Sequence, residues 1–477
     1  MGKIDYVRRP RRAAASGLAV AMVMSGLLLA TGNGVAQGAV PGQGVGVVSD
    51  LTWYMSRADM DRSIAMMSDA GVQWVRASMN WATLEPNAKG VLDPWWMPEL
   101  DYAIQKARAA GIQVLMPISD GVPYWASADP AKYTDTSGQH WNKAWKPYNF
   151  QDYADFARTL VNRYKGFGVR HYEVWNEPNY VRFWPSGPDP ADYTAMLRAA
   201  YPAIKQADPG ATVVMGGVSG SDYTFLQGIY SAGGGAYFDV AAVHPYTNNT
   251  DPTACWYEPG TTRYAKFAFC GIEEVRKTML ANGDSRSLWL TEMGWSTATN
   301  GVTEAAQADY LTKAFTKVQS YPYVTNSFWY SFRNNWWTYN APGDIEANYG
   351  LVRVDFSLKP AFNAFKAYAT AGGVTTTTAV PVVDTVAPTL TDVRVSGVKR
   401  ESATVSWTTN EVSSSVVEYW PVATMVTATA SQRGMVTAHQ VGLTSLQRAT
   451  TYNYRVLSTD PGGNRSVSAT YAFVTSR

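Results

Sequence analysis

The sequence is poor in the residues that build disulfide frameworks and metal sites. It has 2 cysteines, too few for a disulfide scaffold, and 4 histidines without the spacing of a metal-ligand motif. Positive and negative charges nearly cancel, with 40 Lys and Arg against 38 Asp and Glu, so there is no broad basic field to hold nucleic acid. Because 46% of the residues are hydrophobic and only 16% are charged, a disordered chain is excluded. We therefore expect a folded protein without a metal, another cofactor or a nucleic-acid partner.

Aromatic residues are the abundant class. They make up 13% of the chain, including 18 Trp and 29 Tyr. This excess fits either a large packed core or a cleft that stacks against the flat apolar faces of sugar rings, and composition alone does not choose between the two. The length of 477 residues predicts two domains, or one large barrel with an appendage.

Residues 1–39 have the layout of a secretory signal peptide. Basic residues up to Arg12 precede an apolar stretch over 13–31, and small residues follow. Cleavage after Ala36 or Ala39 would release the remaining chain outside the cell or in its envelope. The apolar stretch is also long enough for an uncleaved anchor, whereas no later segment is long and apolar enough to span a bilayer. After cleavage we expect a secreted monomer without a membrane contact.

Export has a consequence for the two cysteines. An oxidising compartment favours a disulfide between Cys255 and Cys270. It would close a loop of about 15 residues and stabilise the fold by roughly 3 kcal/mol in the chain-entropy model.

Residues 40–371 alternate short β-type runs with helical stretches. Eight strands are expected, at 44–49, 74–79, 113–118, 171–175, 212–216, 238–243, 287–291 and 324–330. Eight helices are expected between and after them, at 57–70, 99–110, 150–164, 191–207, 223–231, 272–282, 305–320 and 360–369. This alternation predicts an α/β fold with a parallel sheet. A doubly wound sheet usually carries a glycine-rich phosphate turn after its first strand, and none follows here, so we predict a (β/α)8 TIM barrel.

The composition changes at Gly372. Residues 372–387 are rich in Thr, Pro and Val and predict an extended linker. Residues 388–477 lack helical periodicity and contain short alternating runs, which predict a small antiparallel sandwich.

Two carboxylates follow strands on different sides of the predicted barrel. In such a barrel, reactive side chains collect at the C-terminal ends of the strands. The fourth strand ends at Asn176 and Glu177, and the seventh ends at Glu292. Carboxylates at the ends of buried strands are costly unless they are used or paired. A helix-capping role would explain Glu177 alone, but it does not explain both residues at one mouth, so we predict a working pair.

The segments 173–179 and 291–295 carry a family resemblance. The first is Glu-Val-Trp-Asn-Glu-Pro-Asn and the second is Thr-Glu-Met-Gly-Trp. Together they resemble the retaining glycoside hydrolases of clan A, (β/α)8 enzymes that include cellulases and β-xylosidases, and within them family 39 and related bacterial exopolysaccharide endo-hydrolases. The likeness covers residues 45–369. It implies that Glu177 is the acid/base, that Glu292 is the nucleophile and that Asn176 contacts the sugar 2-hydroxyl.

The same resemblance implies four further substrate-binding residues. Arg76 matches the arginine beside the nucleophile at the end of strand two. His244 and Tyr246 match a pair at strand six, and Trp329 matches an aromatic platform under the sugar at strand eight.

Elementary electrostatics supports these roles. Retaining hydrolysis needs two carboxyls about 5–5.5 Å apart, one protonated and one ionised at rest. Two charges that close repel by roughly 3 kcal/mol at an effective dielectric near 20, so one of them holds a proton. Arg76 and the hydroxyl of Tyr246 beside Glu292 would keep Glu292 ionised, and an apolar flank from Trp175 would favour the protonated form of Glu177.

The C-terminal sandwich carries a second resemblance. Residues 446–456 are similar to the leucine-turn-tyrosine pattern of a fibronectin type III domain, with Tyr452 as its corner tyrosine. Arg448 stands where such domains usually have proline. Because few aromatic residues remain for an exposed face, we expect a spacer or docking module rather than a sugar binder.

The sequence thus predicts a secreted retaining glycoside hydrolase for a β-linked, polymeric carbohydrate. Tryptophans in or near the expected loops favour a long cleft: Trp125, Trp141, Trp145, Trp184, Trp256, Trp295, Trp336 and Trp337. The alternative is a non-catalytic glycan-binding or cell-surface adhesion protein on a glycosidase-like barrel. The sugar, the linkage and the choice between internal and terminal bonds stay open, because loop shape sets them.

Overall fold

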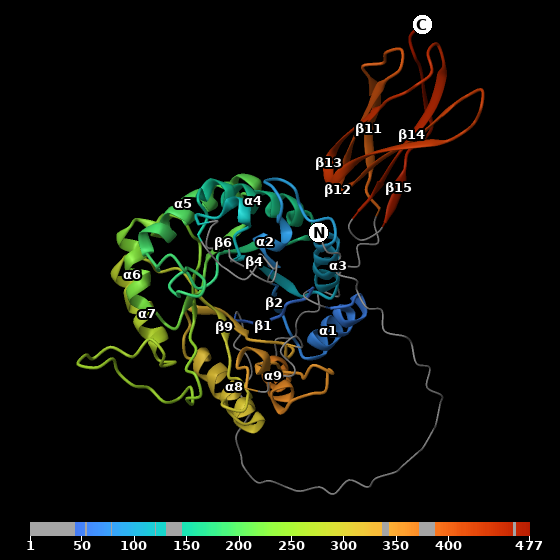
Figure 1. The fold of residues 1–477 in the computed structure, drawn as a ribbon. Coiled ribbons are helices and arrows are strands. Elements are labelled where there is room, and N and C mark those ends of the chain that lie inside the picture. Colours follow the sequence, from blue (N-terminus) through green and yellow to red (C-terminus); the bar gives the residue numbers. More distant parts are fainter. Residues whose placement is uncertain are drawn as a thin grey trace, which may run out of the picture. The chain divides into compact units, whose positions relative to one another are not determined.

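The computed structural model describes residues 43–52, 55–77, 79–119, 121–129, 146–335, 343–371, 387–460 and 464–477, and Figure 1 shows their fold. The expected signal peptide at 1–39 and nearly all of the expected linker at 372–387 lie outside the described residues, so both stay predictions. Within the described part, none of the helices is at once long enough and apolar enough to traverse a lipid bilayer.

A parallel sheet curls into a closed barrel. Its order is β6-β5-β4-β2-β1-β10-β9-β8-β7, with β3 also paired to β4. The ring closes because Val214 pairs in parallel with Val240, just before β8, and Val218 of β7 pairs with Val243 of β8. The strands are β1 (Gly44–Val48), β2 (Trp74–Arg76), β3 (Met79–Asn80), β4 (Gln113–Ser119), β5 (His171–Val174), β6 (Thr212–Met215), β7 (Val218–Ser219), β8 (Ala241–His244), β9 (Leu288–Met293) and β10 (Val324–Trp329).

Helices surround this barrel on the outside (Figure 1). They are α1 (Arg57–Asp69), α2 (Trp81–Leu84), α3 (Trp96–Ala109), α4 (Phe150–Tyr164), α5 (Pro190–Ala207), α6 (Tyr223–Ser231), α7 (Gly271–Ala281), α8 (Glu304–Gln319) and α9 (Pro360–Ala371). Each expected helix is present to within about three residues at either end. The sequence places the starts well because side chains such as Asn149 and Thr303 accept hydrogen bonds from N–H groups of the first turn. These features confirm the predicted (β/α)8 barrel.

Two glycines interrupt the fifth strand position between β6 and β7. A Cβ at Gly216 would lie 2.6 Å from the carbonyl oxygen of Val174, and one at Gly217 would lie 2.2 Å from Nε2 of His244. Only residues without a side chain allow the chain to pass this close to β5 and β8. The backbone of Gly217 thereby reaches residues at the mouth of the barrel.

The C-terminal residues form a separate antiparallel sheet domain with its own core. Its strands are β11 (Leu390–Ser396), β12 (Ala403–Pro421), β13 (Ala428–Leu443), β14 (Thr451–Thr459), β15 (Arg465–Val467) and β16 (Tyr471–Val474). Trp407 and Tyr452 are buried in that core. The N–H of Gln447 donates a hydrogen bond of 2.9 Å to the hydroxyl of Tyr452, which ties the turn before β14 to the strand.

The predicted disulfide is confirmed. Cys255 and Cys270 are bonded, with their Cα atoms 5.7 Å apart. The bond closes the long segment between β8 and α7 at the point where α7 begins.

Candidate active site

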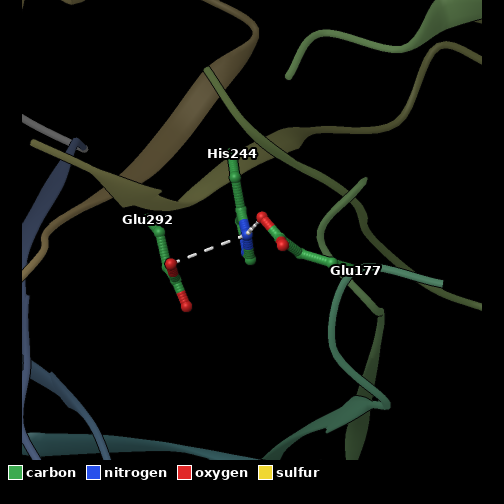
Figure 2. A group of neighbouring side chains, drawn as sticks. All are labelled: Glu177, His244 and Glu292. Atoms are coloured by element: carbon green, nitrogen blue, oxygen red, sulfur yellow. Dashed lines mark hydrogen bonds and ion pairs between the residues drawn. The ribbon is translucent and has the colours of Figure 1, made fainter. Parts of the chain in front are cut away.

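Three side chains from three strands converge at the mouth of the barrel (Figure 2). Glu177 follows β5, His244 ends β8 and Glu292 lies in β9. One carboxylate oxygen of each glutamate and one ring nitrogen of His244 all lie within 4.8 Å of one another. The barrel therefore brings together the two carboxylates that the sequence predicted as a pair.

The chain leaves β5 in an unusual conformation. Trp175 and Glu177 have positive φ angles of 73° and 43°, a left-handed region that costs a residue with a side chain about 1–3 kcal/mol. Hydrogen bonds hold this shape. The hydroxyl of Tyr153 accepts from the N–H of Trp175 at 3.0 Å, and the carbonyl of Gly217 accepts from the N–H of Glu177 at 3.1 Å. The turn fixes the direction in which Glu177 enters the mouth.

Arg76 connects three residues of the site and is only 2% exposed. Its Nε lies 2.5 Å from Glu173, its Nη1 lies 2.6 Å from Glu292, and its Nη2 donates to the side-chain oxygen of Asn176 at 2.9 Å. Burial alone would lower the pKa of Arg76, but the charges of Glu173 and Glu292 raise it above its usual value. The guanidinium is therefore a fixed positive charge that orients two carboxylates and one amide.

Glu292 is held in its ionised form. Its Oε1 accepts from Arg76, and its Oε2 accepts from the hydroxyl of Tyr246 at 2.8 Å. Burial alone would raise the pKa of Glu292, but the positive charges of His244 and Arg76 and the hydrogen bond from Tyr246 lower it below its usual value. This is the electrostatic state that a nucleophilic carboxylate requires.

His244 lies between the two carboxylates and is completely buried. Its Nδ1 is 3.0 Å from Oε1 of Glu177 and 3.7 Å from Oε2 of Glu292, and its Nε2 is 3.0 Å from Oγ1 of Thr291. Burial alone would lower the pKa of His244, but Glu292 and Glu177 together raise it. The imidazole touches the carboxylates and is not part of the pocket lining, so it positions them.

A pocket of about 690 Å³ opens above these residues. Its lining includes six aromatic rings, Tyr180, Phe183, Tyr246, Phe267, Tyr330 and Tyr349. The charged residues that line it are Asp50, Arg76, Glu177, Arg182, Asp222, Lys266, Glu292 and Glu346. The volume and the mixture of flat apolar rings with hydrogen-bonding groups suit a sugar-sized ligand.

Two carboxylates of the site were not among the predicted residues. Asp50 lines the pocket just after β1. Burial and the charge of Glu292 raise the pKa of Asp50, the charge of Arg76 lowers it, and the net result is a pKa of about 6. Glu173 is fully buried within β5, where it pairs with Arg76. The sequence held a signal for Glu173, because a glutamate in the middle of a buried strand needs a partner.

The structure places Trp329 differently from the expectation. Its side chain is fully buried, packs against Trp295 with ring centroids 5.9 Å apart and does not line the pocket. Successive residues of a strand point to opposite faces, so the adjacent Tyr330 lines the pocket instead. The predicted aromatic platform at strand eight is therefore wrong by one residue.

The four expected loop tryptophans that the structure describes do not line the pocket. Trp184 and Trp295 are buried, and Trp125 packs edge-to-face on Trp81. Trp256 is 36% exposed and outside the pocket lining. Trp141, Trp145, Trp336 and Trp337 lie outside the described residues. The ring contacts of Trp175 are with Tyr153 and Trp184 behind the strand, so they do not carry the apolar flank expected beside Glu177.

Glu177, His244 and Glu292 are also close enough to ligate a metal ion. The surrounding charges do not suit that use. The guanidinium of Arg76 already lies 2.6 Å from Glu292, and a cation bound there would be repelled by it. One nitrogen of His244 is engaged by Glu177 and the other by Thr291. The arrangement is better suited to moving a proton than to holding a cation.

Comparison with protein families gives matches over both parts of the chain. The model described as Cellulase (glycosyl hydrolase family 5) matches residues 29–335. The model described as Purple acid Phosphatase, N-terminal domain, matches residues 388–475. No curated protein sequence matches the chain.

Solved structures with the same fold include glycoside hydrolases. A family 39 glycoside hydrolase from Bacteroides cellulosilyticus WH2 has a TM-score of 0.54 at 20% identity, covering 85% of this chain and 81% of its own. A GH5_18 protein from Streptomyces cattleya, solved with GlcNAc, has a TM-score of 0.52 at 18% identity, covering 72% and 82%. An exo-β-1,4-mannosidase from Opitutaceae bacterium strain TAV5 has a TM-score of 0.51 at 17% identity, covering 70% and 61%. At these identities the likeness concerns the fold.

Proposed function

The chain belongs to the cellulase family, glycosyl hydrolase family 5, and from this premise we propose that it is a secreted enzyme that hydrolyses β-linked glycans with retention of anomeric configuration. The motifs after strands four and seven predict family 39, and the matching model is that of family 5; the same motifs serve several families of the clan. The family supports glycosidase activity and a carbohydrate substrate, and the remaining steps are argued from the site.

The separation of the two carboxylates carries the proposal. One oxygen of Glu177 lies within 4.8 Å of one oxygen of Glu292. Retaining glycosidases hold their carboxyls about 5–5.5 Å apart, whereas inverting ones need about 6.5–9.5 Å to fit a water between carboxylate and sugar. The short gap supports direct attack on the sugar by one carboxylate.

The charges around Glu292 give it the role of nucleophile, which leaves Glu177 as the acid/base. Ionised Glu292 attacks the anomeric carbon while Glu177 gives its proton to the glycosidic oxygen, so the bond to the leaving sugar breaks and a glycosyl ester forms. Glu177, now ionised, takes a proton from water, and the resulting hydroxide attacks the anomeric carbon and releases Glu292. Arg76 and Tyr246 stabilise the carboxylate that leaves in this second step.

The remaining parts of the chain fit an exported enzyme. The charged, apolar and small-residue order of 1–39 supports secretion, as does the disulfide between Cys255 and Cys270. The hydrogen bond from Gln447 to Tyr452 supports a fibronectin type III-like module that serves as a spacer or docking unit. We propose that the enzyme acts as a monomer.

Azide rescue tests the mechanism. Glu292→Ala is expected to lower turnover of aryl β-glycosides by at least about 1,000-fold, and added azide should then yield an α-glycosyl azide, because azide replaces the missing nucleophile on the same face. Glu273→Ala is the matched control, because Glu273 accepts a hydrogen bond from Tyr321 and does not line the pocket. Turnover by Glu292→Ala close to that of the unaltered enzyme would refute the assignment.

A further inference from the structure

An ion pair joins two segments that leave opposite sides of the barrel. Arg182 lies in the turns that follow β5, and Glu346 begins a short 3-10 helix (Glu346–Asn348) that follows β10. In the barrel, β4, β2 and β1 separate β5 from β10 on one side, and β6 to β9 separate them on the other. Nη1 of Arg182 nevertheless lies 3.4 Å from Oε1 of Glu346. The pair therefore spans the mouth.

The pair lies at the rim of the catalytic pocket. Both side chains line the pocket, yet they are 56% and 50% exposed, whereas the side chains of Glu177 and Glu292 are only 9% and 12% exposed. The carboxylates thus form the floor and the ion pair lies nearer to solvent.

The pocket extends to both sides of the line from Arg182 to Glu346. Val48, Asp50 and Arg76 line it from the first two strand positions, and Ser219, Asp222 and Asn248 line it from the fifth and sixth. An ion pair that joins the fourth position to the eighth therefore crosses above the pocket between these two groups.

The segments that carry the pair are themselves anchored. On one side, the side chain of Asn179 exchanges hydrogen bonds of 2.7 and 3.0 Å with the backbone of Ser219. On the other side, the hydroxyl of Ser296 donates to the carbonyl of Ile345 at 2.7 Å, and Nζ of Lys359 donates to the carbonyl of Asn348 at 2.9 Å. The crossing can therefore be opened by rotating two side chains while the segments stay in place.

We propose that Arg182 and Glu346 roof the catalytic pocket and thereby select the ends of glycan chains over internal bonds. The proposal rests on the glycosidase function proposed above and adds the form of substrate that the same site accepts. A chain end can enter beneath the pair. An internal segment continues on both sides of the bond to be cleaved, so it can reach the pocket only if Arg182 and Glu346 separate. A chain whose end carries a bulky group also requires the pair to separate.

End-capped substrates test this selection. The probes are 4-nitrophenyl β-oligosaccharides of a sugar that the enzyme cleaves, with and without a 4,6-O-benzylidene cap on the non-reducing end. For the unaltered enzyme we expect kcat/KM to be at least about tenfold lower on the capped probe. Arg182→Ala and Glu346→Ala should each reduce this ratio to below about threefold. The double variant R182E/E346R, which restores a pair of opposite charges, should restore discrimination.

Lys366→Ala is the matched control, because it removes an exposed ion pair with Asp69 of 2.7 Å between α9 and α1. It should leave the capped-to-uncapped ratio unchanged. If the unaltered enzyme cleaves both probes equally, or if Arg182→Ala behaves like Lys366→Ala, the roof is refuted while the glycosidase function stands. If the unaltered enzyme cleaves no aryl β-glycoside, the proposed function itself fails, and the roof fails with it.

Discussion

Gly217 lies directly against His244, so that a Cβ on the glycine would stand 2.2 Å from Nε2 of the imidazole. The backbone of Gly217 is equally engaged, because its N–H donates to Glu173 at 3.1 Å and its carbonyl accepts from Glu177 at 3.1 Å. Gly217, between β6 and β7, therefore contacts Glu177, His244 and Glu173. Catalytic geometry depends on a residue that has no side chain.

Gly217→Ala should damage both activity and stability. The added methyl displaces His244 or the chain, which should cost about 1–3 kcal/mol of the free energy of unfolding. A displacement near 1 Å at the carboxylates should lower turnover about 100-fold. Gly210→Ala is the control, because the nearest atom to its Cβ is 3.4 Å away, an ordinary contact. Denaturant unfolding and aryl-glycoside turnover measure the two effects. Equal behaviour of the two variants would show that the close approach at Gly217 is not needed.

Tyr246→Phe should shift the acid limb of the pH–activity profile to higher pH. The tyrosine hydroxyl helps to lower the pKa of Glu292, and Glu292 works in its ionised form, so losing the hydrogen bond raises the pH at which activity appears. A hydrogen bond to a charged group contributes about 1.5–3 kcal/mol, or about one to two pKa units. Because Arg76 remains 2.6 Å away and still lowers the pKa of Glu292, we expect a shifted acid limb and, on that limb, a roughly tenfold loss of kcat/KM.

The control for this profile is Tyr321→Phe. It removes a hydrogen bond of 2.9 Å from a tyrosine to Glu273, outside the pocket lining. Its acid limb should coincide with that of the unaltered enzyme. An unshifted limb in Tyr246→Phe would mean that the hydroxyl does not tune the nucleophile.

Asp50→Asn should stabilise the fold while impairing the site. In the folded protein, burial and Glu292 raise the pKa of Asp50 from 3.8 to about 6. Between these values the unfolded chain is ionised while the folded one holds its proton, so the penalty on folding grows as pH rises towards 6 and stays constant above it. At about 1.4 kcal/mol per pKa unit, the gain in the amide variant is at most about 3 kcal/mol.

Thermal unfolding at two pH values checks this prediction. The variant should melt at a higher temperature than the unaltered protein near pH 7 and at the same temperature near pH 3, where the folded and unfolded carboxyls are both largely protonated. Solvent reaches the Asp50 side chain, so the measured gain should lie below the upper limit. An identical change at both pH values would show that the ionisation of Asp50 does not oppose folding.

Local patterns were sufficient to predict the barrel. Asn149 and Thr303 begin helices by side-chain caps, and a buried spacing such as Tyr153, Phe156 and Leu160 in α4 marks a helix face, so element type follows from neighbours in the chain. Glu177 and Glu292 were predictable for a related reason. Each is an acidic residue at the end of an apolar strand, and the barrel topology alone places such ends at one mouth.

The sequence by itself therefore determined three things. They are the alternation of strands and helices, the positions of the two catalytic carboxylates in the chain, and the pairing of the two cysteines. The tertiary structure alone decided that Tyr330 and not Trp329 faces the pocket, that Asp50 stands beside Glu292, and that Arg182 meets Glu346. The physical reason is the distance along the chain over which each kind of interaction acts. Periodicity and capping act over a few residues, whereas strand register and the path of long connections depend on packing between segments that are distant in the chain.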